Sequence, residues 1–327
     1  MSLDEFLEEW NNTSDRILVR TSGSTGQPKP LWVEKRRMEA SARITCGFLG
    51  LQPGDTALLC LPLDYIAGKM MVVRSLTCGL QLVSVHSDGH PLLSDHLPDV
   101  IDFAAMVPLQ VHNSLQSDIE CRRLAAIRHL IIGGGPIDDA LAHRLRTMPN
   151  AVWSTYGMTE TLSHVALRRL SGPEASAWYS PFPSVSLSLN ADGCLVIDAP
   201  TVCAERLVTN DMAELRPDGH FRIVGRRDNV VCTGGLKVQM EEVERRLQQH
   251  TALPLMVTKC TDPKLGEAVV LLCQTDDTDS LRTLCQQVLP RYWQPRHYLT
   301  VSTLPTTANG KPARAEARRL AEAFVNK

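Results

Sequence analysis

The sequence lacks the features that mark several large classes of protein. Its 327 residues contain no apolar run near the roughly 18–20 residues that a membrane-spanning helix needs. Basic and acidic residues nearly balance, at 34 and 36, so no charge excess indicates nucleic acid or an anionic membrane. The acidic N-terminus MSLDEFLEEWNN does not resemble a secretory signal. We therefore expect a cytoplasmic protein that binds neither nucleic acid nor membrane.

Paired metal ligands are also missing. The 10 cysteines include no C-x-x-C pair and lie among apolar residues, as Cys60 and Cys273 do, which favours reduced core thiols over disulfides or zinc. His86, His90 and His96 are neighbours, but their Ser/Asp/Gly/Pro surroundings favour a surface loop over a metal site. We expect no metal apart from an ion carried by a nucleotide.

Short apolar strands alternate with helical patterns in the first half of the chain. The expected strands are 57–61, 80–85, 106–111, 129–133 and 152–156. The expected helices between them are 69–79 and 138–148, and Ser2 with Glu5 forms a capping box for an N-terminal helix. This alternation predicts an α/β sheet.

Hairpin patterns begin at Ser184, and a block of mixed strands and helices follows residues 225–229. About 100 residues of mixed elements suffice for an independent domain. We therefore expect an N-terminal α/β domain with β-hairpins over 1–227 and a small α+β domain over 228–327.

The stretch TSGSTGQPKP at Thr21–Pro30 has the composition of an anion-binding loop. It is not a Walker A loop, because Gly23 and Gly26 are too close in sequence and Lys29 lies between two prolines, where no helix begins. Taken alone, the stretch fits a phosphate loop or an ordinary turn.

The stretch resembles the phosphate loop of the adenylate-forming superfamily, which includes acyl-CoA synthetases, peptide-synthetase adenylation domains and luciferases. Further segments resemble motifs of that superfamily in the same order, with Asn210 where glycine is usual: IIGGGPI (131–137), STYGMTET (154–161), LVTNDMAEL (207–215), GRRDNVVCTGGLKVQMEEVE (225–244) and PTTANGKPAR (305–314). The resemblance covers nearly the whole chain from Thr21 onward.

The resemblance implies that a carboxylate reacts with ATP to give an acyl-adenylate and pyrophosphate, and that the acyl group then passes to coenzyme A. ATP and Mg²⁺ are implied, with Glu160 as the metal ligand. Lys311, Thr159 and Glu160 are the implied catalytic residues. Lys311 would bridge the substrate carboxylate and the α-phosphate and stabilise charge there, and Thr159 would donate to the α-phosphate or to the substrate carboxylate. The implied nucleotide-binding residues are Thr21, Ser22, Gly23, Ser24, Thr25, Gly26, Lys29, Gly134, Gly135, Pro136, Tyr156, Gly157, Asp211 and Arg226.

The same resemblance implies that the small domain is mobile. Asp228 would be its hinge, and rotation after adenylation would withdraw Lys311. Gly234 and Gly235 would then line a narrow channel for the thiol, where a bulky side chain would not fit.

Only 20 residues precede the phosphate loop, where typical members have well over a hundred. We expect the shortened body to expose a face that a second subunit covers, in a homo-oligomer. The shortened chain resembles o-succinylbenzoate–CoA ligases of menaquinone biosynthesis. Two segments carry this resemblance together with the chain length: YGMTETLSHVALRR and AGKMMVVRSLTCG.

That substrate is an aromatic keto acid with two carboxylates, and the one that is not activated needs a cationic or hydroxyl-rich partner. We predict Arg74 for it, because a guanidinium binds a carboxylate in bidentate fashion. Lys69 is the alternative cation, and Tyr65, Ser163 and His164 are further predicted pocket residues.

Other readings stay open on the sequence. One is a related aryl or short-chain acid–CoA ligase. A carrier-protein adenylation domain is another. The last is a degenerate nucleotide-binding protein, against which the intact Glu160, Lys311 and hinge segment argue.

Overall fold

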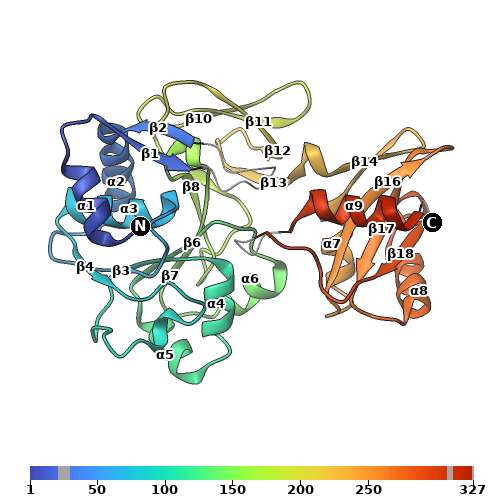
Figure 1. Cartoon of the computed structure of the whole chain (residues 1–327), viewed down its shortest axis with the longest axis horizontal. Helices are drawn as coiled ribbons and strands as arrows, with labels where there is room; N and C mark the ends of the chain where they lie inside the picture. The colour runs from blue at the N-terminus through green and yellow to red at the C-terminus, as the bar shows by residue number, and fades with distance from the viewer. Residues whose placement is uncertain (21–29, 308–311, 326–327) are drawn as a thin grey trace. The chain divides into compact units, whose positions relative to one another are not determined.

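The computed structural model describes residues 1–20, 30–307 and 312–325 (Figure 1). A mixed sheet with the strand order β4-β3-β5-β6-β7-β8-β9 forms the centre of the N-terminal part. Neighbouring strands from β4 to β7 run parallel, whereas β8 pairs antiparallel with β7 and with β9. Its strands are β3 (Thr56–Leu59), β4 (Gln81–Ser84), β5 (Phe103–Met106), β6 (His129–Ile132), β7 (Ala151–Gly157), β8 (His164–Arg169) and β9 (Ser180–Pro181).

Helices lie against both faces of this sheet, as is usual where strands run parallel. On β5, Ala104 and Met106 belong to a buried cluster with residues of α4, α5 and α6, whereas the Phe103 ring lies beneath Arg74 of α3. The helices of this part are α1 (Leu3–Asn11), α2 (Lys35–Leu49), α3 (Ile66–Cys78), α4 (Pro108–Ser114), α5 (Asp118–Ala126) and α6 (Asp139–Leu145), with 3-10 turns η1 (Pro91–Leu93) and η2 (Thr159–Thr161).

Local sequence explains where several of these helices begin and end. Ser2 and Glu5 form the predicted capping box of α1, with the Ser2 amide 2.6 Å from the Glu5 carboxylate. Gly50 and Gly79 end α2 and α3 in the left-handed conformation, at φ 67° and 69°, which glycine adopts without a steric penalty.

One predicted element is wrong. The expected strand 106–111 ends at Met106, and helix α4 begins at Pro108. Proline is favoured in the first turn of a helix, because its fixed φ is helical and its missing N–H would have no partner there. The apolar run MVPLQV therefore divides between a strand end and a helix start.

Two smaller sheets follow from hairpin-forming segments. β1 (Arg16–Arg20) and β2 (Pro30–Glu34) pair antiparallel, with Arg20 opposite Pro30. In another sheet of four strands, each strand pairs with the next one in the sequence. Its strands are β10 (Ser186–Leu189), β11 (Cys194–Asp198), β12 (Leu207–Leu215) and β13 (Phe221–Arg226).

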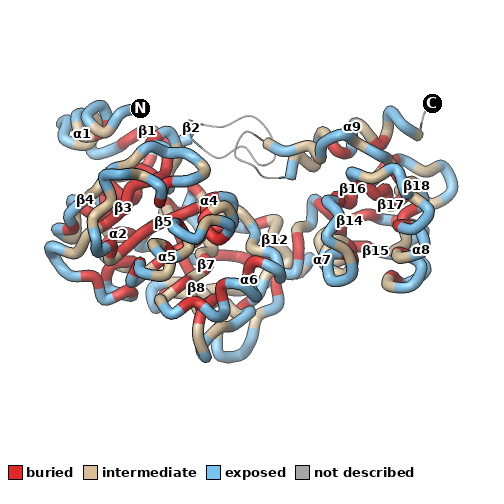
Figure 2. The backbone as a smooth tube through the Cα atoms, turned by 90° about the horizontal axis from the view of Figure 1, so that it is seen from below, coloured by how far each residue is buried: buried red, intermediate tan, exposed pale blue. Residues whose placement is uncertain are grey.

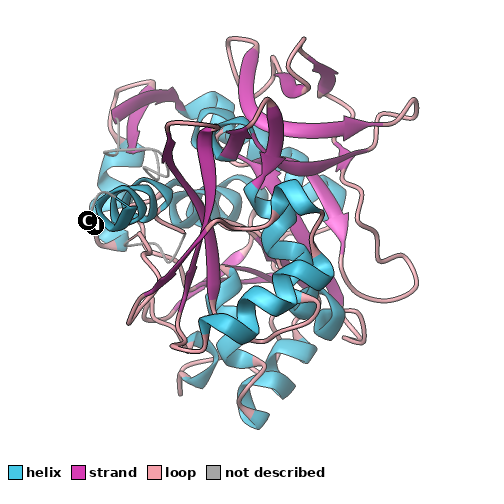
Figure 3. Cartoon of the chain, turned by 90° about the vertical axis from the view of Figure 1, so that its right-hand side faces the viewer, coloured by secondary structure: helices cyan, strands magenta, loops and turns pink. Residues whose placement is uncertain are grey.

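The C-terminal part is a sheet with helices, as the sequence predicts (Figure 3). Its strands are β14 (Val230–Thr233), β15 (Leu236–Gln239), β16 (Leu255–Asp262), β17 (Gly266–Cys273) and β18 (His297–Thr300). Its helical elements are η3 (Arg227–Asn229), α7 (Met240–Gln248), α8 (Thr278–Val288), η4 (Arg291–Trp293) and α9 (Arg314–Val325). β16 and β17 are buried along most of their length (Figure 2), because α7 and α8 pack on one face and α9 on the other.

The chain divides into two compact units. The first comprises Met1–Ser188, Val196–Leu207 and Leu215–Arg222, and the second comprises Leu189–Leu195, Val208–Glu214 and Ile223–Lys327. The mixed α/β body and the α+β C-terminal sheet confirm the predicted fold class. The functional boundary at Asp228 stays a prediction. No helix within the described residues is long and apolar enough to cross a membrane.

Candidate functional site

The predicted nucleotide-binding residues that the structure describes in the first unit lie where parallel strands end. β6 ends at Ile132 and is followed by Gly134–Pro136, while β7 ends at Gly157 and is followed by Thr159 and Glu160. The carboxyl ends of parallel strands lie at one edge of a sheet, which is where open α/β folds bind ligands.

The glycine turn after β6 has backbone requirements of its own. Gly134 has φ +82°, a conformation that side chains disfavour. A Cβ at Gly133 would collide with the Thr155 hydroxyl of the next strand. Gly134 and Pro136 are exposed, and Gly135 is half-buried beside Pro108. The turn thus leaves accessible backbone at the sheet edge.

Tyr156 lies at the end of β7 among aromatic rings. Its ring meets that of Phe221 edge-on at 5.1 Å between centroids and lies 5.9 Å from that of Tyr179. Gly157 follows it, where any Cβ would collide with the Ser163 carbonyl. Position 157 therefore requires glycine because the backbone of Ser163 passes directly against it.

The turn between β7 and β8 presents Glu160. Leu162 has φ +65°, unusual for a branched side chain, and the Thr161 hydroxyl bonds the Ser163 carbonyl at 2.7 Å. These contacts fix a tight turn in which Thr159 is buried and Glu160 is exposed. In the described part of the chain the Glu160 carboxylate makes no ion pair or hydrogen bond.

An exposed carboxylate without a partner suits Mg²⁺, which usually takes one or two protein carboxylates and completes its shell with water and phosphate oxygens. No cluster of several His, Cys, Asp or Glu side chains that could hold a metal ion occurs in 1–20, 30–307 and 312–325. His90 instead places its Nδ1 2.8 Å from the buried Glu120 carboxylate. The residues present therefore fit a nucleotide-borne ion at Glu160.

The structure brings Arg74, Ser163 and His164 together. Arg74, on α3, is 2% exposed, and its Nη2 donates to the Ser163 hydroxyl at 2.6 Å. Ser163 Oγ also lies 3.0 Å from His164 Nδ1. Burial lowers the pKa of Arg74 to about 10, and burial together with the Arg74 charge lowers the pKa of His164 well below its usual range.

Arg74 is a buried cation that has no counter-ion among the described residues. Its remaining contacts are the Met71 sulfur, 3.8 Å from Nη1, and the Phe103 ring, 5.9 Å from Cζ. Its Nε is buried with no hydrogen-bond partner, and no carboxylate of the described residues pairs with it. Burying a charge is expensive unless it is paired.

Lys69 and Tyr65 do not join this group. The Lys69 amine lies 3.6 Å from the Glu9 carboxylate and 3.3 Å from the Leu18 carbonyl. Burial lowers the pKa of Lys69, and Glu9 opposes that shift. Tyr65 is half-buried at the N-cap of α3. Between the two predicted cations, only Arg74 contacts Ser163.

In the second unit, Arg226 joins two predicted residues. Its Nη1 donates to Asp211 at 3.0 Å and its Nη2 donates to Asp228 at 2.8 Å. Burial disfavours the charged form, but Asp228 and Asp211 raise the pKa of Arg226 overall. Asn210 donates to Asp228 at 3.2 Å and accepts from Arg227 at 3.0 Å. Asn210, which stands where the motif usually has glycine, thus connects β12 by hydrogen bonds to the predicted hinge residue Asp228 and its neighbour Arg227.

Gly234 and Gly235 form the exposed turn between β14 and β15, with φ +57° and +81°. This backbone accounts for both glycines, and their role in a thiol channel stays a prediction. The remaining predicted residues lie outside the described residues: Thr21, Ser22, Gly23, Ser24, Thr25, Gly26, Lys29 and Lys311.

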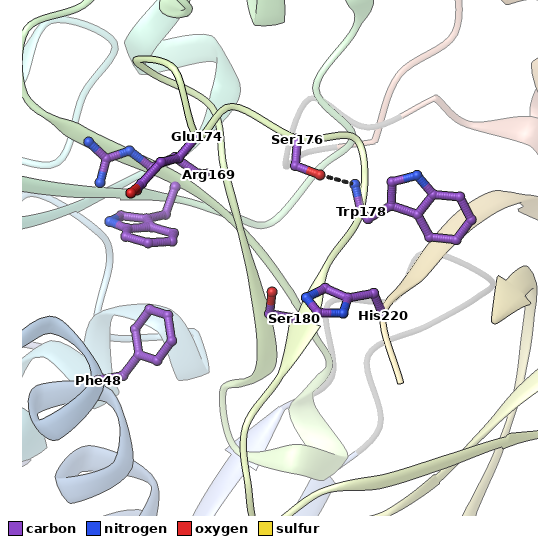
Figure 4. A pocket seen from close by; sticks show the side chains of 8 residues that line it. Phe48, Arg169, Glu174, Ser176, Trp178, Ser180 and His220 are labelled. Atoms are coloured by element: carbon purple, nitrogen blue, oxygen red, sulfur yellow. Dashed lines mark hydrogen bonds between the residues drawn. The ribbon is translucent and has the colours of Figure 1, made fainter. Parts of the chain in front are cut away.

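A cavity of about 320 Å³ in the first unit is separate from these residues (Figure 4). Arg169 stacks over Trp153 at 4.9 Å, and the Ser176 hydroxyl accepts from the Trp178 amide at 3.0 Å. The lining residues are Phe48, Trp153, Arg169, Glu174, Ser176, Trp178, Ser180 and His220. None of the predicted site residues that the structure describes lines this cavity.

Sequence reasoning missed two neighbours of the site. Thr45 of α2 lies 3.1 Å from His164 Nε2, and Asn210 was noted as a departure from the motif without a role. The apolar spacing of α2, where Met38, Ala42, Cys46 and Leu49 are buried, was the available signal for that helix. No local signal identifies Thr45 itself.

Comparison with known proteins agrees with this arrangement. The model of the family described as AMP-binding enzyme matches residues 10–202. The chain belongs to this family. Its fold is that of the adenylate-forming superfamily, and the family comprises AMP-forming ligases that use ATP.

Curated relatives of this chain include 2-succinylbenzoate–CoA ligases. The 2-succinylbenzoate–CoA ligase of Listeria monocytogenes is 25% identical over 343 residues, covering 94% of this chain and 70% of that protein. The 2-succinylbenzoate–CoA ligase of Bacillus cereus is 25% identical over 353 residues, covering 96% and 72%.

Solved structures of the family share the fold. An acyl-CoA synthetase (AMP-forming)/AMP-acid ligase II-like protein from Dyadobacter fermentans is 32% identical with a TM-score of 0.65, covering 96% of this chain and 92% of that one. The Bacillus subtilis O-succinylbenzoate Coenzyme A Synthetase (MenE), in complex with ATP and magnesium, is 22% identical with a TM-score of 0.76, covering 91% and 69%.

Proposed function

We propose that this chain is an AMP-forming ligase that activates o-succinylbenzoate and transfers it to coenzyme A, as a step of menaquinone biosynthesis. One oxygen of the reacting carboxylate attacks the α-phosphorus of ATP, and pyrophosphate leaves. The thiol of coenzyme A then attacks the acyl carbon, and AMP leaves. The names of the curated relatives support this reaction.

The observation that carries the choice of acid is the unpaired, buried guanidinium of Arg74. A second carboxylate on the acid supplies the missing counter-ion, with charge-assisted hydrogen bonds to Arg74. A monocarboxylic acid would leave the Arg74 charge without a partner. The site would therefore bind an acid with a second carboxylate more tightly than a monocarboxylic acid. Tyr65 stays a predicted residue of the acid pocket, whereas the Lys69 amine is paired with Glu9 and is not needed for the second carboxylate.

The nucleotide is assigned to the sheet edge. Tyr156 offers a ring face to adenine, and Gly134, Gly135 and Pro136 offer an accessible turn beside it. Thr159 donates to the α-phosphate, and Glu160 would hold Mg²⁺. When bound, that ion neutralises charge on the phosphates.

The remaining roles rest on the sequence motifs. Asp211, oriented by Arg226, accepts the ribose hydroxyls. The predicted phosphate loop at 21–29 binds the β- and γ-phosphates, and Lys311 stabilises charge at the α-phosphate. Asp228 is the hinge of a C-terminal domain that moves between half-reactions. A homo-oligomer and a cytoplasmic location stay predictions.

Pyrophosphate release with ATP and Mg²⁺ tests the proposal across o-succinylbenzoate, benzoate, 4-coumarate and a medium-chain fatty acid, each with and without coenzyme A. We expect release with o-succinylbenzoate alone and an acyl-CoA product when coenzyme A is present. Release with another acid would keep the chemistry and reject the role of Arg74. No release with any acid, while ATP still binds, would instead support a degenerate nucleotide-binding protein.

The Lys311→Ala variant separates the two half-reactions. We expect it to lose adenylation and still form the thioester from preformed acyl-adenylate. An equal loss of both half-reactions would contradict the role assigned to Lys311.

A further inference from the structure

A continuous row of hydrogen bonds connects Arg74 to the backbone of α2. Arg74 Nη2 lies 2.6 Å from Ser163 Oγ, which lies 3.0 Å from His164 Nδ1. On the other side of the imidazole, His164 Nε2 lies 3.1 Å from Thr45 Oγ1, which lies 3.1 Å from the Ser41 carbonyl. The row joins three elements that are distant in the sequence: α3, the start of β8 and α2.

The two ends of the row and a neutral His164 together fix the direction of every hydrogen bond between the ends. A carbonyl only accepts, so Thr45 donates to Ser41 and must accept from His164 Nε2–H. A neutral imidazole has one N–H, so its Nδ1 is an acceptor, and Ser163 donates to it. A guanidinium only donates, so Ser163 accepts from Arg74. All these assignments are mutually consistent when His164 is neutral.

Burial keeps the row in this state. Thr45 is fully buried, and Ser41, Arg74 and His164 are nearly so. Burial and the nearby Arg74 charge hold the pKa of His164 well below its usual range, so the imidazole is neutral near pH 7. The Phe182 ring lies 5.6 Å from that of His164. Ser163 is half-buried, whereas around Thr45 and His164 water is excluded, so a partner lost there is not replaced by solvent.

The direction of the bonds determines what Ser163 can do. Its only proton is directed to His164, so the hydroxyl is an acceptor for Arg74 and has no proton left for a bound acid. Arg74 keeps Nε and part of Nη1 unpaired apart from the Met71 sulfur. Ser163 therefore orients the guanidinium, and the guanidinium alone meets an anion.

We propose that Thr45 and His164 are positioning residues that hold Ser163 as a hydrogen-bond acceptor and so orient Arg74 toward the second carboxylate of the acid. This inference rests on the proposed function. It changes the role of His164 from a side chain that lines the pocket to one that acts through Ser163. It also assigns a role to Thr45.

The tautomer of His164 is the direct test, and it needs no activity. The ¹⁵N-edited imidazole spectrum of the whole chain, with the His164 signal assigned by its loss in His164→Asn, should show the Nε2–H tautomer. In Thr45→Val that preference should be lost, because Nε2–H has no acceptor. An Nδ1–H tautomer in the wild type, or an unchanged tautomer in Thr45→Val, would overturn the proposal.

Kinetics supply the second test. Thr45→Val should raise KM for o-succinylbenzoate about fivefold, the effect of one lost neutral hydrogen bond, while KM for ATP stays the same. Ser75→Ala is the matched control. Ser75 is also buried and lies next to Arg74 on α3, but its hydroxyl donates to the Met71 backbone carbonyl and takes no part in the row. Equal KM values for o-succinylbenzoate in Thr45→Val and Ser75→Ala would refute the positioning role.

Two substitutions of His164 separate positioning from packing. His164→Asn keeps an oxygen near the Nδ1 position that can accept from Ser163, whereas His164→Leu removes every acceptor. We expect KM for o-succinylbenzoate closer to the wild-type value in His164→Asn. Identical values in two folded variants would contradict the proposal. If the wild type releases no pyrophosphate with o-succinylbenzoate, the proposed function fails, while the His164 tautomer still decides whether the row exists.

Discussion

The Arg314 guanidinium donates one hydrogen bond to each carboxylate oxygen of Glu244, at 2.6 and 2.7 Å. The same residues clamp Val257 of β16, whose amide donates to Glu244 at 2.6 Å and whose carbonyl accepts from Arg314 at 2.7 Å. Burial opposes the charge on Arg314, but Glu244 raises its pKa overall. The start of α9 is thereby fixed to α7 and β16 inside the C-terminal unit.

We predict that Glu244→Gln lowers the free energy of unfolding of this unit by about 3 kcal/mol, because it leaves a largely buried cation without its charge partner. Urea unfolding and the hydrogen-exchange rate of the Val257 amide measure the effect. Glu316→Gln is the control, since its exposed pair with Arg319 on α9 should contribute under about 1 kcal/mol. Equal effects of both substitutions would contradict the clamp.

Arg74→Met should separate stability from function. Replacing an unpaired buried cation by an apolar side chain of similar length should leave the free energy of unfolding unchanged or higher. The same change should raise KM for o-succinylbenzoate about 10- to 100-fold, through lost charge-assisted hydrogen bonds. Thermal unfolding and pyrophosphate release measure the two effects. Arg43→Met on the exposed face of α2 is the control, and a lowered Tm with an unchanged KM in Arg74→Met would reverse the interpretation.

Glu160→Gln should slow adenylation strongly without affecting the fold. Glu160 is exposed and unpaired in the described residues, so Tm should not change. Pyrophosphate release should fall about 100-fold, as when one group that stabilises transition-state charge is lost. Titration with Mg²⁺ should show a weaker apparent affinity. Glu205→Gln, also exposed, should behave as the wild type, and a normal rate in Glu160→Gln would exclude it as the metal ligand.

The neutral state of His164 predicts a pH dependence of stability. Its pKa in the folded chain is well below 6.5, because of burial and the Arg74 charge, so below pH 6.5 the unfolded chain binds the proton more readily. Stability should therefore be constant above pH 6.5 and fall toward pH 5 by up to about 1.4 kcal/mol per unit from this residue. Urea unfolding of the wild type and His164→Asn measures it. Burial also lowers the pKa of His129, which contributes equally to both proteins, so parallel curves would disprove a neutral His164.

Local signals explain which parts of the fold could be predicted. The capping box of Ser2 and Glu5 needs only neighbouring residues, and the strands and helices after Asp228 have clear periods bounded by turns. The run 106–111 could not be assigned from its apolar residues, because one proline divides it between strand and helix. Helix α2 was not predicted, although its buried residues have helical spacing.

Sequence reasoning could name the candidate site residues that lie within one motif. It could not identify contacts between residues that are far apart in the sequence. Tyr156 and Glu160 are named only through the resemblance of residues 154–161 to a family motif, and their roles stay predictions. The contact of Arg74 with Ser163 joins residues 89 positions apart, and that of Thr45 with His164 joins residues 119 apart. Chemistry led to Arg74 as a carboxylate partner, but only the packing of α3 distinguishes it from Lys69, whose amine turns to Glu9.

The short connection between β7 and β8 has a consequence for how the chain tolerates insertions. It carries Glu160 and, three positions on, Ser163, and it then enters an antiparallel strand in which successive side chains point to opposite faces. One added residue would displace the carboxylate and, by shifting the register of β8, turn His164 away from α2. Metal binding and acid selection would be lost together. The length of this turn is therefore constrained by both functions, whereas the hairpin at Asn190–Gly193 carries neither Glu160 nor Ser163.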